Sequence, residues 1–419
     1  MLESLKSALK VSELRSKILF TLGLIFIFRL GAHIPVPGVN LERFAELVNS
    51  GLIFSFFDVI SGGALKNFSV FAMGIMPYIN ASIIMQLLTV VIPHLERLAK
   101  EGDEGRKKIT QYTRYLTVVL AFIQGLGVVV GVQNSLVNPN VATYIMTALT
   151  ITAGTTFLMW LGEQITEKGI GNGISLLIFA GIVSSVPQGI AGLAEYLNAG
   201  TINVFSLLLL IIIGGLVIAG VVAVQEGQRR IPVQYAKRVV GRRVYGGQTT
   251  HLPLRVNQAG VIPIIFASSL LMFPETIVNM FQNSPVAAFY AEWFGWGTLF
   301  HTLFYALLII GFTYFYTAVI MNPADVADNI KKYGGFIPGL RPGRPTAEYI
   351  SRVMSRVTLA GAIFLALIAI LPNFVLLATR IPNIYFGGTS LLIVVGVALD
   401  TMKQVESHLL MRSYQGFIK

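Results

Sequence analysis

Residues 204–224 read VFSLLLLIIIGGLVIAGVVAV, and residues 226–257, which follow almost directly, read EGQRRIPVQYAKRVVGRRVYGGQTTHLPLRVN. The first stretch carries no charge and is long enough to cross a bilayer, which takes about 20 apolar residues. The second stretch has seven Lys or Arg and one acid, and another apolar run follows at 261–273. A basic loop between two membrane spans predicts a docking site for a large anionic partner. Its simpler alternative is contact with anionic lipid headgroups.

The composition of the whole chain points to the same class of protein. The 419 residues are 54% hydrophobic and 12% charged, with a mean hydropathy of +0.71. A soluble domain carries about 25% charged residues, so low charge together with long apolar runs indicates an integral membrane protein. The chain has no cysteine, which excludes a disulfide framework and thiolate chemistry.

The apolar runs predict an all-α membrane protein with ten transmembrane helices. Several of the runs are short or interrupted, but each is close to the length that a membrane helix needs. The predicted spans are 18–34, 68–92, 115–132, 144–161, 172–187, 204–224, 258–278, 298–320, 355–377 and 386–402.

The placement of positive charge tests this count of spans. With ten spans the two termini share a side, and 27 of the 31 Lys and Arg residues then fall on that side. The exceptions are Arg43, Lys66 and Arg380 on the other side and Arg29 inside the first span. Because cytoplasmic loops carry the excess of Lys and Arg, the N-terminus and the C-terminus are both predicted to be cytoplasmic.

Ten spans divide into two sets of five, at residues 18–187 and 204–404, with an external connection at 188–203. An odd number of spans per set inverts the second set relative to the first, and inverted repeats place a functional pathway at their interface. Pro77 and Pro263 lie early in the second span of each set, which hints at this symmetry. The alternative is that prolines are simply common in membrane helices.

Four segments are predicted to lie outside the spans on the cytoplasmic side. Residues 1–17 favour an amphipathic surface helix, with a frayed tail as the alternative. The remaining three are loops at about 226–257 and 322–352 and a C-terminal tail at 405–419.

Residues 51–67 read GLIFSFFDVISGGALKN, which is apolar enough to enter a membrane but too short to cross it. Ser61-Gly62-Gly63 is expected to end any helix. We therefore predict a half-helix that enters from outside and stops, which requires a cavity or protein around its end. An interfacial hairpin outside the membrane is the alternative.

The predicted spans contain almost no ionisable residue at mid-depth, which counts against a proton- or ion-coupled transporter. Nucleotide-binding, metalloprotease and serine-hydrolase motifs are absent from the sequence. No catalytic residue, metal site or cofactor is therefore expected.

Bulky apolar residues recur instead at helical spacing. Ile75 and Ile79 share one helix face, and Ile174 and Ile178 share another. Ordinary core packing or lipid contact is the simple interpretation of these pairs, and a hydrophobic constriction that closes a water path is the functional one. Polar residues also occur at span depth, where they can form weak contacts between helices. These polar residues are Asn80, Ser82, Gln124, Ser268 and Ser269.

Long motifs across nearly the whole chain resemble the SecY family, the pore-forming subunits of the bacterial Sec protein-conducting channel. The motifs are FRLGAHIPVPGV (28–39), SGGAL (61–65), FAMGIMPYINASIIMQLL (71–88), EGRKKITQYTRY (104–115), FLMWLGEQITEKGIGNGIS (157–175), GQRRIPVQYAKR (227–238), GRRVYGGQTTHLPLRVNQAGVIPIIFASS (241–269), GLRPGRPTAEYI (339–350) and YFGGTSLLIVVGVALD (385–400).

The resemblance implies two inverted five-helix halves around an hourglass pore. It implies a plug at about 53–67 and a lateral gate between spans 2, 3, 7 and 8. The implied pore ring is Ile75, Ile79, Ile174, Ile178, Ile265 and Ile393. The implied gate residues are Asn80, Gln124 and Ser268, and the implied plug residues are Phe57, Asp58, Ile60, Ser61, Gly62 and Gly63. The implied contacts for the motor ATPase SecA and the ribosome are Arg229, Arg230, Lys237, Arg238, Arg242, Arg243, Arg255 and Arg341.

The function that the resemblance implies is passage of unfolded preproteins across the bacterial plasma membrane, with sideways release of transmembrane segments into lipid. The implied partners are SecE, SecG, SecA, ribosomal RNA, preproteins with their signal sequences, and membrane lipids. Two rival functions from other classes are a secondary transporter of a small solute with an inverted repeat and a membrane-embedded enzyme. The transporter predicts buried coupling groups, and the enzyme predicts a nucleophile or metal constellation.

Overall fold

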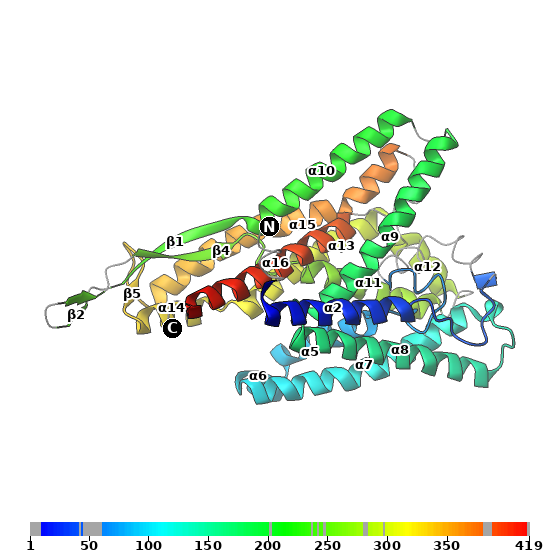
Figure 1. The fold of residues 1–419 in the computed structure, drawn as a ribbon, viewed down its shortest axis with the longest axis horizontal. Coiled ribbons are helices and arrows are strands. Elements are labelled where there is room, and N and C mark those ends of the chain that lie inside the picture. The colour runs from blue at the N-terminus through cyan, green and yellow to red at the C-terminus, as the bar shows by residue number, and fades with distance from the viewer. Residues whose placement is uncertain are drawn as a thin grey trace.

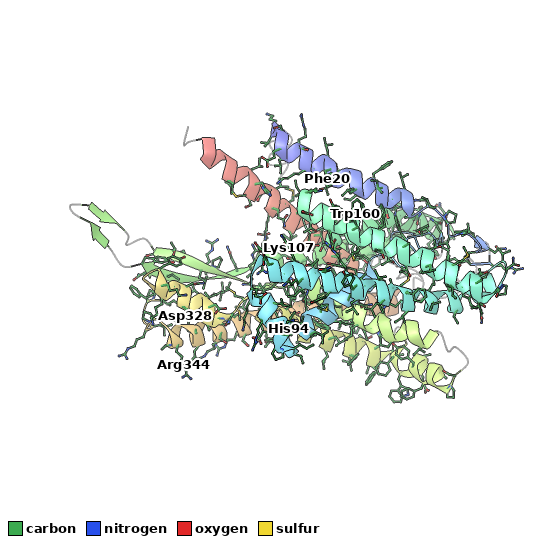
Figure 2. All side chains as sticks on the ribbon, turned by 90° about the horizontal axis from the view of Figure 1, so that it is seen from below. Phe20, His94, Lys107, Trp160, Asp328 and Arg344 are labelled. Carbon is green, nitrogen blue, oxygen red and sulfur yellow. The ribbon has the colours of Figure 1, made fainter. Side chains whose placement is uncertain are left out.

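The computed structural model describes residues 10–41, 43–44, 61–200, 203–235, 238–240, 243–245, 249–279, 284–295, 298–379 and 388–416. The chain forms a bundle of long helices, and a β ribbon projects from one end of the bundle (Figure 1). Asp328 and Arg344 lie at the ribbon end of the molecule, whereas Phe20 and Trp160 lie along the helical bundle (Figure 2). The predicted fold class, a helical membrane protein, is confirmed, and the ribbon adds β structure that the sequence prediction did not contain.

The first set of helices is α2, α5, α7, α8 and α9. Their bounds are Ser12–Gly31, Met76–Val91, Asp103–Gly131, Val141–Lys168 and Gly173–Asn198. A short helix, α6 (Pro93–Lys100), follows α5 at an angle of 99° and packs Leu95 and Leu98 against α7. A 3₁₀ turn, η1 (Gln133–Ser135), follows α7.

The second set is α10, α11, α13, α15 and α16. Their bounds are Val204–Glu226, Ile262–Asn279, Leu299–Ile320, Arg344–Thr379 and Gly388–Gly416. Two shorter helices lie between them, α12 (Pro285–Phe294) and α14 (Pro323–Lys332).

The same neighbour relations occur in both sets. In the first set α5 packs on α7, α7 on α8 and α8 on α9, while α2 lies against α8 and α9. In the second set α11 packs on α13, α13 on α15 and α15 on α16, while α10 lies against α15 and α16. This repetition in chain order supports the predicted division into two halves. The halves meet where α11 contacts α5 and α7, and again where α16 contacts α9.

Several predicted helix ends are wrong. The second span was predicted from residue 68, but residues 62–75 form turns and α5 begins at Met76. Phe68 and Gly74 have φ angles of 37° and 55°, which interrupt a right-handed helix, and Pro77 suits the first turn of the helix that follows.

Other helices are longer than predicted. α9 continues past residue 187 to Asn198 with Pro187 inside it, and α16 continues to Gly416 through the predicted C-terminal tail. At the N-terminus, α2 starts at Ser12, so the end of the predicted 1–17 helix is continuous with the first span. Residues 1–9 lie outside the described residues.

By length and composition, six described helices are able to cross a membrane, or up to seven if α5 and α6 are one bent span. Ile262–Met272 is a further, shorter apolar helix. The short or charge-interrupted segments, α2 among them, do not pass this test, so the count of ten spans stays a prediction.

The ribbon is built from the connection between α10 and α11 and from the connection between α13 and α15. Strand β1 (Gln228–Tyr235) pairs antiparallel with β4 (Thr249–Arg255), and its last residues pair with β5 (Gly335–Phe336). The tip carries a separate hairpin, β2 (Arg238–Val240) with β3 (Arg243–Tyr245). One face of the β1–β4 pair is buried on α14 and α15, around Ile231, Leu254, Ile330 and Ile350.

Candidate functional site

The six predicted pore-ring isoleucines all belong to, or pack against, one hydrophobic cluster that includes residues of both halves. Ile75 and Ile79 reach this cluster from the start of α5, Ile265 from α11 and Ile393 from α16, and Ile178 comes from α9. These five are buried in one hydrophobic cluster, and the half-buried Ile174 packs against it. We call this group with its neighbours the junction cluster. Because helices of both halves contribute to it, any separation of the halves has to open it.

A sequence repeat places the two main helices of the junction cluster. Residues 74–82 read GIMPYINAS and residues 260–268 read GVIPIIFAS, so Gly, Pro, Ile, Ala and Ser recur at the same spacing. In both copies the glycine has a positive φ angle and the proline is the second residue of the helix. Ile79 and Ile265 are therefore equivalent residues of the two halves. The prolines were recognised from the sequence, but the full repeat was missed although it is readable there.

A cavity of about 340 Å³ opens onto the junction cluster from the ribbon end. Its apolar floor includes Val261 and Val397, which belong to the cluster, and Val397 lies one turn from Ile393 on the same face of α16. Both halves line it. The polar and charged lining residues are Asn172 and Ser175 from the first half and Arg255, Asp400, Thr401, Lys403, Gln404 and Ser407 from the second.

Polar contacts surround the mouth of this cavity. Lys403 pairs with Glu226 at an N–O distance of 2.8 Å, which joins α16 to α10. The backbone N–H of Gly171 donates to Oε1 of Gln404 at 2.9 Å, which joins the first half to the second. The lining of the cavity therefore changes from charged and polar residues to apolar residues of the junction cluster.

The three predicted gate residues, Asn80, Gln124 and Ser268, are all buried on helices that contact one another, α5, α7 and α11. Ser268, however, donates its hydroxyl to Ile265 of its own helix at 2.9 Å. The next residue, Ser269, donates across the boundary between the halves to the sulfur of Met76, at 3.6 Å. Sequence reasoning noted Ser269 as polar but did not place it at the boundary, because its direction depends on the rotation of α11.

The predicted plug is described only at its end. Phe57, Asp58 and Ile60 lie outside the described residues. Ser61 is buried, and Gly62 and Gly63 follow with φ angles of 69° and 83°, which a right-handed helix does not accommodate. The carbonyl of Gly62 accepts a hydrogen bond from the Arg29 guanidinium. A Cβ atom at Gly62 would lie 2.7 Å from Cα of Gly181 in α9, so the backbone of the segment packs directly on that helix.

The two basic loops predicted as separate partner contacts form one unit. The pairing of β5 with β1 and the shared core around Ile231 and Ile337 join the 322–352 loop to the ribbon. Arg229, Arg230, Arg255 and Arg341 are exposed on this unit. Arg238 and Arg243 belong to the hairpin at its tip, whereas Lys237 and Arg242 lie outside the described residues.

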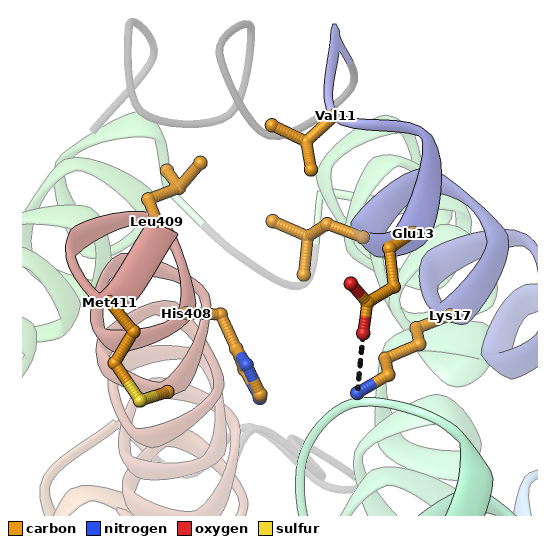
Figure 3. A pocket seen from close by; sticks show the side chains of 7 residues that line it. Val11, Glu13, Lys17, His408, Leu409 and Met411 are labelled. Atoms are coloured by element: carbon orange, nitrogen blue, oxygen red, sulfur yellow. Dashed lines mark ion pairs between the residues drawn. The ribbon is translucent and has the colours of Figure 1, made fainter. Parts of the chain in front are cut away.

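A second cavity, of about 260 Å³, lies between the start of α2 and the end of α16 (Figure 3). Glu13 and Lys17 form an ion pair at 3.9 Å on one wall, and His408, Leu409 and Met411 line the other. It lies apart from the junction cluster. Across the described ranges of the chain, no group of His, Asp and Glu side chains could hold a metal ion.

Comparisons with known proteins agree with this architecture. The sequence model of the SecY family matches residues 69–402. The protein translocase subunit SecY of Halalkalibacterium halodurans is 52% identical over 436 residues, covering 100% of both chains. That of Pseudomonas aeruginosa is 49% identical and covers 98% of this chain and 94% of the relative.

Among solved structures, a protein-conducting channel is similar to this fold, with a TM-score of 0.67 and 19% identity over 93% of this chain and 91% of that one. Sec61 from a canine ribosome–channel complex has a TM-score of 0.65, 19% identity and the same coverage. At 19% sequence identity, the similarity to these two structures shows the fold alone. The family match, the full-length relatives at about half identity and the shared fold together show that the chain belongs to the SecY family.

Proposed function

We propose that the chain is the pore-forming subunit of a protein translocase and moves unfolded preproteins across a membrane. The observation that carries the proposal is the junction cluster at the floor of the polar cavity. A ring of aliphatic side chains from two halves is closed to water when packed, because hydrophobic constrictions gate by dewetting. Aliphatic side chains also form no hydrogen bonds that would hold a passing polypeptide tightly.

The contact of α11 with α5 and α7 is the proposed lateral gate. Ile79 and Ile83 of α5 and Ile265 of α11 belong to one apolar cluster, and Ser269–Met76 is a weak hydrogen bond to a thioether. Helices held in this way separate at low cost, which suits release of an apolar segment of about 20 residues into lipid. The proposed gate residues remain Asn80, Gln124 and Ser268, and Ser269 joins them.

The basic unit built from both loops is the proposed docking surface for ribosomal RNA and for the motor ATPase SecA. One relative by fold, Sec61, is described in a ribosome–channel complex. Phosphate backbones attract clustered arginines with strong salt dependence, and the rigid core under Ile231 and Ile337 presents these arginines as one surface. SecE and SecG are the proposed companion subunits, and signal sequences and lipids are the proposed ligands of the gate.

The proposed location is the bacterial plasma membrane, with both termini and the ribbon in the cytoplasm. The positive-inside distribution supports this orientation. The start of α2 and the end of α16 lie toward the ribbon end of the bundle, as this orientation requires (Figure 1). The proposed domains are the two halves at 18–187 and 204–404, flanked by cytoplasmic segments.

The test is ion conductance and preprotein transport in liposomes that contain the channel. Ile79→Asn places an amide in the junction cluster, so it is expected to open an ion leak while transport persists. Ile79→Val, which keeps the site apolar, is the conservative control. Ile309→Asn is a second control. Ile309 is buried in the second half away from the junction cluster, so this change should lower stability without opening a leak. Equal leaks from Ile79→Asn and Ile309→Asn would contradict the proposed constriction.

A further inference from the structure

Helix α12 (Pro285–Phe294) lies between the membrane helices α11 and α13, at the end of the bundle away from the ribbon (Figure 1). It reads PVAAFYAEWF, with one charged residue, Glu292, and four aromatic residues. A helix of this size at the end of two spans is too short to cross a bilayer. Its composition also differs from that of an ordinary solvated connection, because large apolar side chains dominate it.

The helix has distinct faces. Tyr290 and Phe294 are half-buried and turn toward the bundle, whereas Phe289 and Trp293 are 59% and 51% exposed. Residues four apart share a face, so each pair forms one stripe. At 100° per residue, Glu292 points almost opposite to the buried stripe, and the exposed aromatic stripe lies between the two. The aromatic stripe therefore lies on the side of the helix, between the face that packs on the protein and the face that carries Glu292.

The rings of α12 continue into those of α13. Trp293 and Phe294 contact Phe300 with ring centroids 6.4 and 4.8 Å apart, and Phe294 also contacts Phe304 at 6.1 Å. Beside these rings, α13 exposes an apolar stripe at i, i+4 and i+8, formed by Leu299, Leu303 and Leu307. Such a stripe on a membrane span faces lipid. Trp293 thus extends the lipid-facing side of α13 at its end.

α12 is also joined to the gate helix. The hydroxyl of Tyr290 donates to the backbone carbonyl of Leu271 in α11 at 3.3 Å. Leu271 is buried against α13 and α15 in the core of the second half. This hydrogen bond therefore links α12 to the core of the second half.

We propose that the Phe289–Trp293 stripe of α12 is a lipid-binding surface that seats in the headgroup layer of the membrane and anchors α11 through the Tyr290–Leu271 hydrogen bond. Tryptophan and other amphipathic aromatic side chains favour this layer, and a helix with an apolar edge and a charged back lies in its plane. Continuity with the lipid-facing stripe of α13 favours lipid over a partner protein. In the proposed topology this headgroup layer belongs to the external leaflet. The inference itself requires only that α12 lies at the end of the bundle opposite the ribbon.

The chain carries three tryptophans, Trp160, Trp293 and Trp296, which allows a direct measurement of depth. In the variant W160F/W296F, Trp293 is the single fluorophore. The full-length protein is reconstituted into vesicles of phosphatidylcholine brominated near the headgroup end or near the methyl end of the acyl chain. Trp293 should lose more fluorescence with bromine near the headgroup. Trp160, isolated in W293F/W296F, lies on the exposed side of α8 and should be quenched more by the deeper bromine than Trp293 is.

A second reporter pair tests the orientation of the helix. With all native tryptophans replaced by phenylalanine, Phe289→Trp should repeat the shallow lipid quenching, whereas Ala288→Trp, on the face of Glu292, should respond to aqueous iodide. Insensitivity of Trp293 to both brominated lipids would overturn the proposal, whether iodide reaches the ring or a partner protein covers it. Deep quenching of Trp293 equal to that of Trp160 would overturn it as well. Neither result would affect the proposed channel function.

Discussion

The backbone N–H of Gly171, in the turn between α8 and α9, donates to the side-chain oxygen of Gln404 in α16 at 2.9 Å. This hydrogen bond joins the two halves where α9 of the first half contacts α16 of the second. Gly171 has a φ angle of 86°, and a Cβ atom there would lie 2.8 Å from the Leu176 side chain. The conformation of the turn that presents this N–H to α16 therefore requires glycine at position 171.

Gln404→Ala should weaken this connection by about 1 kcal/mol, the net value of a typical hydrogen bond. The expected result is a lower melting temperature and a larger resting ion leak, because the halves lose a fixed contact. Gln404→Glu keeps an acceptor oxygen and should stay close to the unchanged protein. If Ala and Glu variants leak equally, the hydrogen bond does not hold the halves together.

The Ser269–Met76 contact predicts a covalent lock. Because the chain has no cysteine, Met76→Cys with Ser269→Cys introduces one pair on α11 and α5. Short cross-linkers should join the two residues, and the joined protein should fail to release apolar segments into lipid while each single variant works normally. Ser268→Cys with Met76→Cys is the matched control, since Ser268 turns back to its own helix. Equal cross-linking of both pairs would show that the rotation of α11 differs from this structure.

Gly62 and Gly63 form a matched pair for the end of the plug segment. Both have positive φ angles, so alanine at either position costs about 1–2 kcal/mol of backbone strain. Only at Gly62 would the new Cβ atom also meet another backbone, 2.7 Å from Cα of Gly181, whereas Gly63 has open space. Gly62→Ala should therefore displace the segment and raise ion leak, measured in planar bilayers, well above Gly63→Ala. Leak from Gly63→Ala alone would argue against packing on α9 as the cause.

Arg341→Glu should impair export driven by SecA, because it reverses an exposed charge on the proposed docking unit. Arg344→Glu is the control. Arg344 is the first residue of α15 and is already paired with Glu348 at 3.0 Å, so this change reverses a charge three residues from Arg341 without removing Arg341 itself. The measurement is ATP-dependent preprotein uptake at several salt concentrations. Unchanged uptake by Arg341→Glu, or equal loss in both variants, would remove Arg341 as a specific contact.

Much of the fold was readable from local pattern. α10 and α13 begin and end within two residues of their predicted spans. An uninterrupted apolar run in a membrane has to form a helix, because a helix satisfies all its backbone hydrogen bonds internally. Pro77 and Pro263 marked the two helices that meet at the junction cluster. The start of α5 was not predicted, since an apolar run does not reveal that Phe68 and Gly74 adopt left-handed backbone conformations.

By itself, the sequence determined the membrane class and the family, because hydropathy and motif are properties of neighbouring residues. The cytoplasmic orientation and the isoleucine ring stay predictions. Only the tertiary structure decided which side chains meet. It brought Gly171 to Gln404 and Ser269 to Met76, and it joined two distant basic loops through β5. The physical reason is that helix rotation and tilt are set by packing between segments far apart in the chain, and no local pattern encodes them.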